Sequence, residues 1–400
     1  MPAPTMSIDD ARRLFPGHGR DSIYLDTCAR GLLPAPARAA LEAHLDALAS
    51  GTIDKAALFE ATAATRASFA RLVRCAPDEI AFTKNVSEGL NMIAAALDWR
   101  AGDNAVVCLD LEHPNNVYPW LNQRARTGIE VRAVAPLDGH VDAAHIIAAI
   151  DARTRLVTLP TVTFSPGFVT DVAQVAQACR ARGVLLLADA VQSVGVLDTD
   201  VATLGVDALA VSTQKGLCGL YGMGFLYCRR EVAQRLTPAY LARFGVNVGG
   251  GAHEATLGTS NYDLMPAARR FDLGNYNYPG VLVAGASLQI LEAVGTKAIE
   301  AHVRGLAAHL IDGLLAAGLP VAGGAAGAHT GSIVCVGRIG AGGHDSTDDP
   351  QIAALSERLT AAGVVHTIRR GMIRFGLHLY NTAADVDRVL ELAHEHAKAA

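Results

Sequence analysis

Two apolar segments of the sequence each carry, near their end, a side chain that could take part in covalent chemistry. Asp189 lies in VLLLADA (184–190), and Lys215 ends VDALAVSTQK (206–215). Taken singly, each residue has a simpler interpretation: the carboxylate could cap a turn, and the lysine could be a solvent-exposed loop residue. However, only five of the 34 basic residues are lysines, and the residues flanking Lys215 are small or apolar. Such surroundings desolvate an amine and lower its pKa, which favours a nucleophile.

A carboxylate and an amine at the ends of two strands are what the cofactor pyridoxal phosphate requires. The amine bonds covalently to the aldehyde of the cofactor, and the carboxylate keeps the pyridine nitrogen protonated, so that the ring accepts electrons from the substrate. Gln192 follows Asp189 at the start of the next segment. The pair therefore predicts a pyridoxal phosphate enzyme with Lys215 and Asp189 as catalytic residues.

The phosphate of this cofactor needs hydrogen-bond donors. The segment FTKNVSEGL has the pattern strand, turn, helix, and the backbone amides near Val86 and Ser87 would point out of the helix N-terminus. Unpaired amides and the helix dipole attract a dianion there. Ser87 alone is more simply an N-cap. Ser212 and Gln214, beside the lysine, can add side-chain donors.

Two further side chains could act on the substrate. His113 leaves the sheet after the strand NAVVCLD (104–110), where an imidazole could stack on the cofactor and exchange protons; the alternative is an ordinary loop histidine. Arg374, in the strand MIRFG, could hold a substrate carboxylate with its planar fork. A surface ion pair is the alternative, and Arg369 and Arg370 are nearby competitors for the same role.

The elements around these residues alternate between strand and helix. Residues 35–74 have helical spacing, and from 79 to 230 short apolar strands alternate with amphipathic helices. This order predicts an α/β fold with a mostly parallel central sheet and helices on both faces, in which ligands bind at the carboxyl ends of the strands. Residues 245–280 are rich in glycine and asparagine and predict a loop excursion.

The last third of the chain has its own pattern of strands and helices. A long helix begins near 280, and the pattern after it is typical of a smaller α+β unit. We therefore predict a large cofactor-binding domain over 31–280 and a small C-terminal domain over 281–400. Residues 1–30 form an N-terminal segment that we expect to pack with the small domain.

Composition excludes several classes of protein. The formal net charge of −5 is too balanced for a nucleic-acid binder, and 50% hydrophobic residues exclude a disordered chain. The sequence also shows no membrane-spanning segment, no signal peptide, no spacing typical of metal ligands and no nucleotide-binding glycine motif after an early strand. Seven scattered cysteines without a CxxC pair predict reduced thiols and a cytoplasmic location.

Seven segments from about Tyr24 to Asp387 resemble, in order, the class V aminotransferase family. They are DTCARGLLP, FTKNVSEGLN, EHPNNVYPW, ADAVQSVG, STQKGLCGLYGMGFLY, FDLGNYNYPG and IRFGLHLYNTAADVDR. These are fold-type I pyridoxal phosphate enzymes and include cysteine desulfurases, selenocysteine lyases and isopenicillin N epimerase-like proteins. The lysine motif and the Asp-x-x-Gln motif carry most of the resemblance.

The resemblance implies a role for each matching residue. Lys215 is similar to the Schiff-base lysine, Asp189 to the partner of the pyridine nitrogen and Arg374 to the arginine that binds the substrate carboxylate. The other matches are Gln192 to the donor to the phenolic oxygen, His113 to the stacking histidine, and Val86, Ser87, Ser212 and Gln214 to the phosphate ligands. The family commonly has histidine where Gln214 stands.

Two of the matches extend beyond the central motifs. Thr161 stands where desulfurases place an asparagine near the phenolic oxygen. Gly274 and Asn275 resemble the segment that reaches the phosphate of the neighbouring subunit, which implies a homodimer.

The sequence departs from the desulfurases in its sulfur chemistry. Those enzymes carry a nucleophilic cysteine on a loop shortly before the carboxylate arginine, whereas LTAAGVVHTIRRGMIR (359–374) is short and has none. Cys28 in the early DTCARG turn could substitute, although a free cysteine, like Cys218, is more often a packed hydrophobe. Arg30 is a candidate second anionic anchor, which would favour a polar or dicarboxylic substrate.

These observations predict an enzyme that releases a β-substituent from an amino acid of the cysteine type, as a C–S β-lyase. An epimerase or racemase, a persulfide-forming cysteine desulfurase that uses Cys28, and a class V aminotransferase remain open. A binding or regulatory protein on the same scaffold is the rival from another class. The identity of the amino acid and of any sulfur acceptor does not follow from the sequence.

Overall fold

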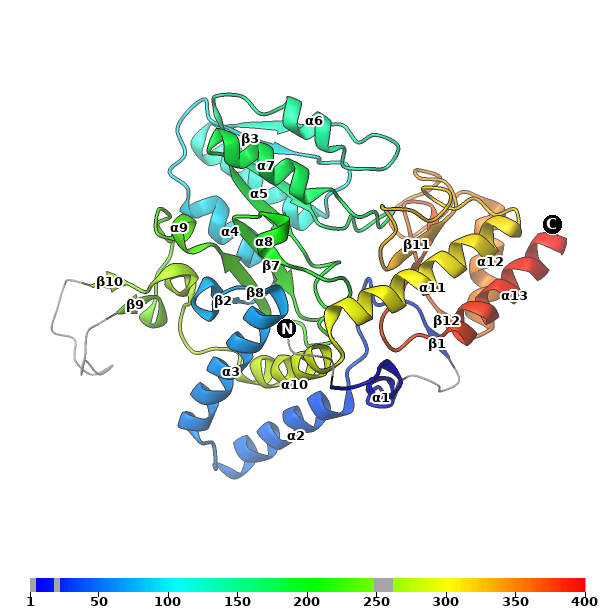
Figure 1. Cartoon of the computed structure of the whole chain (residues 1–400), viewed down its shortest axis with the longest axis horizontal. Helices are drawn as coiled ribbons and strands as arrows, with labels where there is room; N and C mark the ends of the chain where they lie inside the picture. The colour runs from blue at the N-terminus through cyan, green and yellow to red at the C-terminus, as the bar shows by residue number, and fades with distance from the viewer. Residues whose placement is uncertain (1–4, 18–21, 248–261, 400) are drawn as a thin grey trace.

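The computed structural model describes residues 5–17, 22–247 and 262–399 (Figure 1). Its centre is a seven-stranded sheet with the strand order β2-β8-β7-β6-β5-β3-β4. These strands are β2 Ile80–Thr83, β3 Asn104–Val107, β4 Glu130–Ala133, β5 Thr154–Pro160, β6 Leu185–Asp189, β7 Ala208–Ser212 and β8 Gly224–Cys228. Neighbouring strands are parallel, except that β8 is antiparallel to both β2 and β7.

Helices connect and cover these strands. The α-helices are α4 Val86–Ala96, α5 Tyr118–Thr127, α6 Ala143–Ala148, α7 Val172–Arg182, α8 Val201–Leu204 and α9 Arg230–Ala233. Short 3-10 turns and a small ribbon complete this part: η1 Pro77–Glu79, η2 Pro114–Asn116, η3 Arg243–Gly245, η4 Ala267–Phe271, β9 Val246–Asn247 and β10 Asp263–Leu264. Part of the predicted loop excursion, 248–261, lies outside the described residues.

Both faces of the sheet are buried, because alternate side chains of one strand enter different hydrophobic cores. In β6, Leu186 and Ala188 pack into the core that contains α7, whereas Leu185 and Leu187 pack into the core that contains α4. A strand has a period of two residues, so a sheet covered on both faces needs continuous apolar strands. The predicted α/β fold, with a mostly parallel sheet between helices, is confirmed.

The C-terminal part has a separate three-stranded antiparallel sheet in the order β11-β14-β13. Its elements are α11 Thr296–Ala316, β11 Ile333–Val336, α12 Pro350–Ala361, β12 Val364–Val365, β13 Thr367–Arg369, β14 Met372–Gly376 and α13 Ala383–Ala399. The remaining elements are α1 Ile8–Arg12, β1 Ile23–Tyr24, α2 Ala35–Ser50, α3 Lys55–Val73 and α10 Tyr278–Val294.

The N-terminal segment is tied to the C-terminal part by backbone and side-chain contacts. Strand β1 pairs in parallel with β12, and the Asn381 side chain donates a hydrogen bond to the Tyr24 carbonyl at 2.8 Å. The hydroxyls of Thr27 and Tyr380 are 2.5 Å apart. These contacts support the proposed packing with the small domain for the part of the segment near Tyr24, whereas the amides of Thr5 and Met6 donate to the Ala293 carbonyl of α10.

Helix α10 contacts α2 and α3, so it belongs to the larger part of the chain (Figure 1). The Thr65 hydroxyl donates to the Val281 carbonyl at 3.2 Å, and a Cβ on Gly285 would meet that hydroxyl oxygen at 2.5 Å. Packing therefore favours a domain division near Gly295, between α10 and α11, instead of at 280/281. We keep this division as a proposal.

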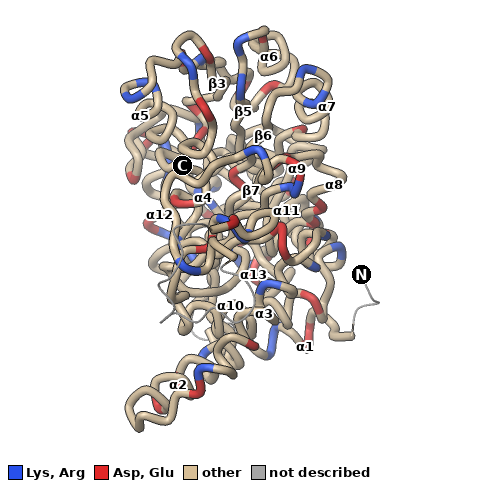
Figure 2. Tube along the Cα trace, turned by 90° about the vertical axis from the view of Figure 1, so that its left-hand side faces the viewer, with Lys and Arg blue, Asp and Glu red and all other residues tan. Residues whose placement is uncertain are grey.

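Charged residues of both signs are interspersed along the whole trace (Figure 2). Among the described residues, no single helix is long and apolar enough to cross a membrane. Helices α10 and α11 reach that length and apolarity only as a pair, which is bent by 79°.

Candidate active site

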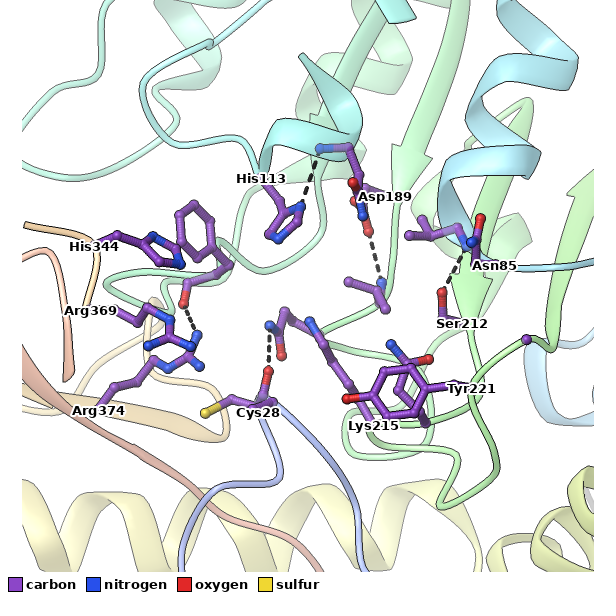
Figure 3. A pocket seen from close by; sticks show the side chains of 18 residues that line it. Cys28, Asn85, His113, Asp189, Ser212, Lys215, Tyr221, His344, Arg369 and Arg374 are labelled. Atoms are coloured by element: carbon purple, nitrogen blue, oxygen red, sulfur yellow. Dashed lines mark hydrogen bonds between the residues drawn. The ribbon is translucent and has the colours of Figure 1, made fainter. Parts of the chain in front are cut away.

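A cavity of about 360 Å³ lies where the carboxyl ends of the central strands face the small sheet (Figure 3). Nine of the fourteen predicted site residues line it: Cys28, Val86, His113, Asp189, Gln192, Ser212, Gln214, Lys215 and Arg374. The other five, which are Arg30, Ser87, Thr161, Gly274 and Asn275, do not. The volume is within the range of about 300–1,000 Å³ that small-molecule sites occupy.

Asp189 and Lys215 reach this cavity from neighbouring strands. Because β6 and β7 are parallel, with Asp189 opposite Ala210, both strands end at the same edge of the sheet. Asp189 is buried, and one of its carboxylate oxygens accepts a hydrogen bond from the Val191 amide at 3.0 Å. Burial raises the pKa of Asp189, while the Val191 amide and the charge of Lys215 act against this.

The Lys215 amine points toward the centre of the cavity (Figure 3). Burial lowers the pKa of Lys215 to about 8, and the nearby Asp189 carboxylate opposes that shift. Within the described ranges, no hydrogen bond or ion pair holds this amine. A larger neutral fraction near neutral pH makes it a competent nucleophile and proton carrier.

The N-terminus of α4 supplies the donors at one end of the cavity. Asn85 is its N-cap, since the Asn85 side chain accepts the Glu88 amide at 3.0 Å. The Val86 amide donates to the Ser212 hydroxyl at 2.7 Å. The expectation that Ser87 opens this helix is therefore corrected: Asn85, an equally good cap two residues earlier, takes that position, and Ser87 lies in the first turn.

His113 lies on the opposite side of the cavity from this helix end (Figure 3). Its Nδ1 accepts the Asn115 amide at 3.2 Å, so the proton of the neutral ring is on Nε2. Burial, followed by the charges of Lys215 and His344, lowers the pKa of His113 to about 4. The ring packs edge-on against Phe164, with centroids 5.5 Å apart. His113 is thus a neutral imidazole near neutral pH.

Two residues predicted near the phenolic oxygen lie in different places. Gln192 lines the cavity, and its side-chain amide donates to the Cys28 carbonyl at 3.0 Å. Thr161 is buried, but its hydroxyl is engaged with the Ser193 hydroxyl at 2.7 Å and does not reach the lining. Gln192 therefore keeps a donor for a ligand, whereas the Thr161 hydroxyl is already engaged.

Arg374 enters the cavity from β14 and is buried. Its Nη1 donates to the Phe164 carbonyl at 2.8 Å, and its Nε donates to the Thr367 hydroxyl at 3.3 Å. In the part of the chain that the structure describes, no carboxylate lies within ion-pair distance of its guanidinium. The fork is held in one orientation with its charge unpaired, which suits a ligand carboxylate.

The two early residues that were predicted to meet the substrate differ. Cys28 lines the cavity, but its thiol is buried and donates to the Asp26 carboxylate over 3.7 Å. Burial raises the pKa of Cys28, so this sulfur stays a thiol. Arg30 is exposed and outside the lining. The DTCARG turn faces its cysteine inward, and the arginine points away because its charge is cheaper to hydrate than to bury.

Gly274 and Asn275 line a separate hollow of about 230 Å³ that shares Gly222 with the main cavity. Asn275 adopts a left-handed conformation with φ 45°. The segment is anchored by the preceding Asp272, which forms a fully buried ion pair with Arg66 at 2.8 Å. These residues thus lie next to the cavity, on the surface of a fixed loop.

Several residues of the cavity were not predicted from the sequence. Asn85, Tyr221 and His344 line it, and so does Arg369, which the sequence offered only as a competitor of Arg374. Glu112 lies behind it: neither oxygen of its buried carboxyl group has a hydrogen-bond partner among the described residues. Burial, then the charge of Asp189, raises the pKa of Glu112 well above its usual range, so this carboxyl group is neutral. The only sequence signal for Glu112 as a residue near the cavity is its position directly before His113.

The side chains of the cavity fit pyridoxal phosphate. Lys215 is an amine that the described protein leaves unpaired, and Asp189 is a buried carboxylate with no arginine beside it. At the N-terminus of α4 the Ser212 hydroxyl accepts the Val86 amide and keeps its own proton, so that Ser212 and the side chain of Gln214 can donate to a phosphate. An aldehyde, a pyridine nitrogen and a phosphate each find a complementary group here.

Comparisons with known proteins agree with this chemistry. The family model for aminotransferase class V matches residues 23–389. The chain is 34% identical over 303 residues to a probable cysteine desulfurase of Methanothermobacter thermautotrophicus, covering 74% of this chain and 73% of that protein. It is 29% identical to the uncharacterized aminotransferase YcbU of Bacillus subtilis, over 95% of each chain.

The fold is also that of solved pyridoxal phosphate enzymes. The structure of the cystine C–S lyase C-DES, in complex with cysteine persulfide, superposes with a TM-score of 0.82, covering 95% of this chain and 99% of that one at 24% identity. The predicted fold type, family and cofactor are thereby confirmed. The chain belongs to the class V aminotransferase family of pyridoxal phosphate-dependent enzymes.

Proposed function

We propose that the protein is a C–S β-lyase that acts on an amino acid of the cysteine type. The substrate loses its α-proton, and its Cβ–S bond breaks with the electron pair leaving on sulfur. Protonation of that sulfur gives a thiol or hydrogen sulfide. Addition of one water to the rest of the molecule gives pyruvate and ammonia. The reaction needs no oxidant and no protein-bound sulfur.

The observation that carries this proposal is the state of the cysteine in the cavity. A persulfide-forming enzyme needs a thiolate that can reach the substrate sulfur. Cys28 is the only cysteine among the described lining residues, and burial keeps it protonated. The segment before Arg374 forms the end of α12, then β12 and β13, and it has no cysteine. In this proposal the sulfur therefore leaves as part of the released β-substituent and is not transferred to a cysteine of the protein.

Four residues would hold the cofactor in this cavity. Lys215 would bind its aldehyde, Asp189 its ring nitrogen, and Ser212 with the Val86 end of α4 its phosphate. Gln192 and Gln214 can add hydrogen bonds from their amides. When bound, pyridoxal phosphate supplies an electron sink that acidifies the substrate α-proton.

The residues of the chain move the protons. A free Lys215 amine with a pKa of about 8 can accept the α-proton near neutral pH and return it. His113 holds a proton on Nε2 at the same pH and can stabilise the leaving sulfur with a hydrogen bond, and the sulfur takes up the proton that Lys215 has accepted. Asp189 holds a negative charge in a buried place, which keeps a bound pyridine nitrogen protonated.

Arg374 orients the substrate. Its guanidinium is fixed by Phe164 and Thr367, so its remaining donors face the cavity in one direction. A bidentate contact with the α-carboxylate would set which bond of the α-carbon faces Lys215.

A homodimer completes the proposal. Tyr221 lines the cavity although it is 64% exposed, and the hollow at Gly274 and Asn275 adjoins the same edge. A second copy seated here would cover Tyr221 and close the phosphate end. We also propose a cytoplasmic location, supported by seven free cysteines.

A single screen tests the reaction type. Purified holoenzyme is incubated with cysteine and S-substituted cysteines, and sulfide or thiol, pyruvate, alanine and exchange of the α-proton with solvent deuterium are measured together. The proposal predicts pyruvate equal to the released thiol or sulfide, without alanine. Formation of alanine would indicate a desulfurase. Exchange of the α-proton without any product would indicate an epimerase. Formation of a keto acid other than pyruvate, dependent on an added keto acid, would indicate an aminotransferase.

A further inference from the structure

Two arginines point into the cavity from one face of the small sheet. Strands β13 and β14 form an antiparallel hairpin in which Thr367 pairs with Arg374 and Arg369 pairs with Met372. Side chains two residues apart on a strand share a face, so Arg369 is the diagonal neighbour of Arg374 on that face. Figure 3 shows the two guanidinium groups side by side, next to His344.

The two-residue turn of this hairpin sets that geometry. Arg370 and Gly371 connect the strands, and both have a positive φ, of 53° and 87°. Two such residues make the tight turn whose twist matches a β-hairpin. The register is therefore fixed, and Arg369 cannot turn to the other face without losing the pairing with Met372.

The charges of the cavity do not balance. Among the described residues, the lining contains Lys215, Arg369 and Arg374 but only one carboxylate, that of Asp189. In the proposed function, Asp189 and Lys215 are committed to the cofactor and Arg374 to the substrate α-carboxylate. Arg369 remains as a second cationic group beside the substrate site.

Arg369 at present pairs with an exposed carboxylate. Asp345, on the segment before α12, forms an ion pair with Arg369, and the Asp345 side chain is 70% exposed while that of Arg369 is 20% exposed. An exposed ion pair contributes little stability. A ligand anion that enters the cavity could therefore replace Asp345 at small cost, and His344, which is next to it in the chain, also lines the cavity.

We propose that Arg369 is a specificity-determining residue that binds a second anionic group, carried on the β-substituent of the substrate. The substrate class is an α-amino acid whose sulfur bears a short carboxylate-containing chain, with Arg374 on the α-carboxylate and Arg369 on the distal one. The sulfur in this assignment rests on the proposed function. The two anion contacts rest on the hairpin alone.

Binding of a non-reacting dicarboxylate tests the anion contacts. Adipate has four atoms between its carboxyl groups, the same number as S-carboxymethyl-cysteine, and its monoamide has the same shape with one charge fewer. Calorimetric titration of the holoenzyme should show adipate binding about tenfold or more tightly than the monoamide. Equal affinity for the two compounds would overturn the proposal.

Three variants assign the effect to Arg369. Arg369→Gln should bring adipate to the affinity of the monoamide while the monoamide affinity stays unchanged. The matched control Arg370→Gln removes the same charge one residue away, outside the lining, and should keep the preference. Asp345→Asn should tighten adipate binding, because it removes the competing carboxylate. A loss in Arg370→Gln equal to that in Arg369→Gln, or no effect of Arg369→Gln in a folded variant, contradicts the assignment.

Turnover provides the second arm. S-carboxymethyl-cysteine and its neutral isostere S-carbamoylmethyl-cysteine are compared in the wild type and in Arg369→Gln. The proposal predicts that the variant raises KM for the charged compound only, with kcat little changed. If adipate is preferred but neither compound is cleaved, the proposed lyase function fails and the anion site stands. If both are cleaved equally well and adipate is not preferred, the anion site fails and the lyase stands.

Discussion

The cavity has two walls that are built in different ways. The sheet wall, formed by the ends of β6 and β7, carries Asp189 and Lys215, whose charges are buried and whose positions follow from parallel strand pairing. The hairpin wall, formed by β13 and β14, carries Arg374 and Arg369, and the second of these faces an exposed carboxylate. Buried charges with shifted pKa values suit bond making, and a partly solvated pair that can be exchanged suits substrate choice. We infer that the sheet wall sets the reaction and the hairpin wall sets the substrate.

The largest expected effect is on the sheet wall. Lys215→Ala should lower kcat by roughly a thousandfold, because the variant loses both the amine that binds the cofactor and the group that carries the proton. Its absorbance spectrum should lose the visible band that borohydride bleaches. The matched control is Lys297→Ala, which removes an exposed lysine of α11 and should change neither property. Retained turnover in Lys215→Ala would contradict the claim that the sheet wall carries the catalytic groups.

The second effect is a pH dependence that also belongs to the sheet wall. A lowered pKa means that Lys215 loses its proton at a lower pH than an exposed lysine does. The rate of pyridoxal phosphate uptake by cofactor-free protein should therefore rise about tenfold per pH unit below pH 8 and level off above it. His113, with a pKa of about 4, should add no step between pH 6 and 7. The measurement is the growth of the visible band at each pH, and a step near 6.5 would contradict the assignment of a neutral His113.

The third effect distinguishes the hairpin wall from the sheet wall. Arg374→Lys keeps the charge but loses the planar fork, so KM for the amino acid should rise about tenfold while kcat changes less. The visible band should be retained, because Arg374 does not hold the cofactor. Steady-state kinetics with a spectrum of each preparation checks both points. A fall in kcat without a change in KM would show that Arg374 acts in the reaction and not in substrate binding.

The smallest effect is expected at the cysteine that lies between the walls. Cys28→Ser replaces a buried, protonated thiol by a smaller hydroxyl, and turnover should stay within about twofold of the wild type. Sulfide or thiol release and pyruvate formation are compared in parallel. Loss of sulfur release with the cofactor still bound would show that Cys28 accepts sulfur, and the enzyme would then be a desulfurase.

The sheet wall was largely predictable from the sequence. Asp189 and Lys215 follow apolar strands, and strand–helix alternation puts such strand ends at one edge of a parallel sheet. The first residue of α4 was not predictable, because Asn85 and Ser87 are both good caps. Only the observed hydrogen bond from the Glu88 amide to Asn85 distinguishes them. The antiparallel direction of β8 was also missed, since a fully buried strand has the same apolar pattern in either direction.

The hairpin wall was only partly predictable. The strand MIRFG and Arg374 were identified, but the turn residues Arg370 and Gly371 lack the usual asparagine–glycine signal, so the register that brings Arg369 beside Arg374 did not follow. Arg30 was favoured instead, although it is exposed in the structure. Which arginine faces the cavity depends on the register that the turn at Arg370 and Gly371 sets, and the spacing of the arginines alone does not give that register.

The central claim is that the Lys215 amine binds pyridoxal phosphate in this cavity. Borohydride treatment of the holoenzyme, followed by digestion and mass spectrometry of the peptides, tests it without any knowledge of the substrate. The account predicts one pyridoxyl-phosphate group per chain, on the peptide that contains Lys215. A group on the peptide of Lys55, Lys84, Lys297 or Lys398 in its place, or no group on any peptide, would contradict it.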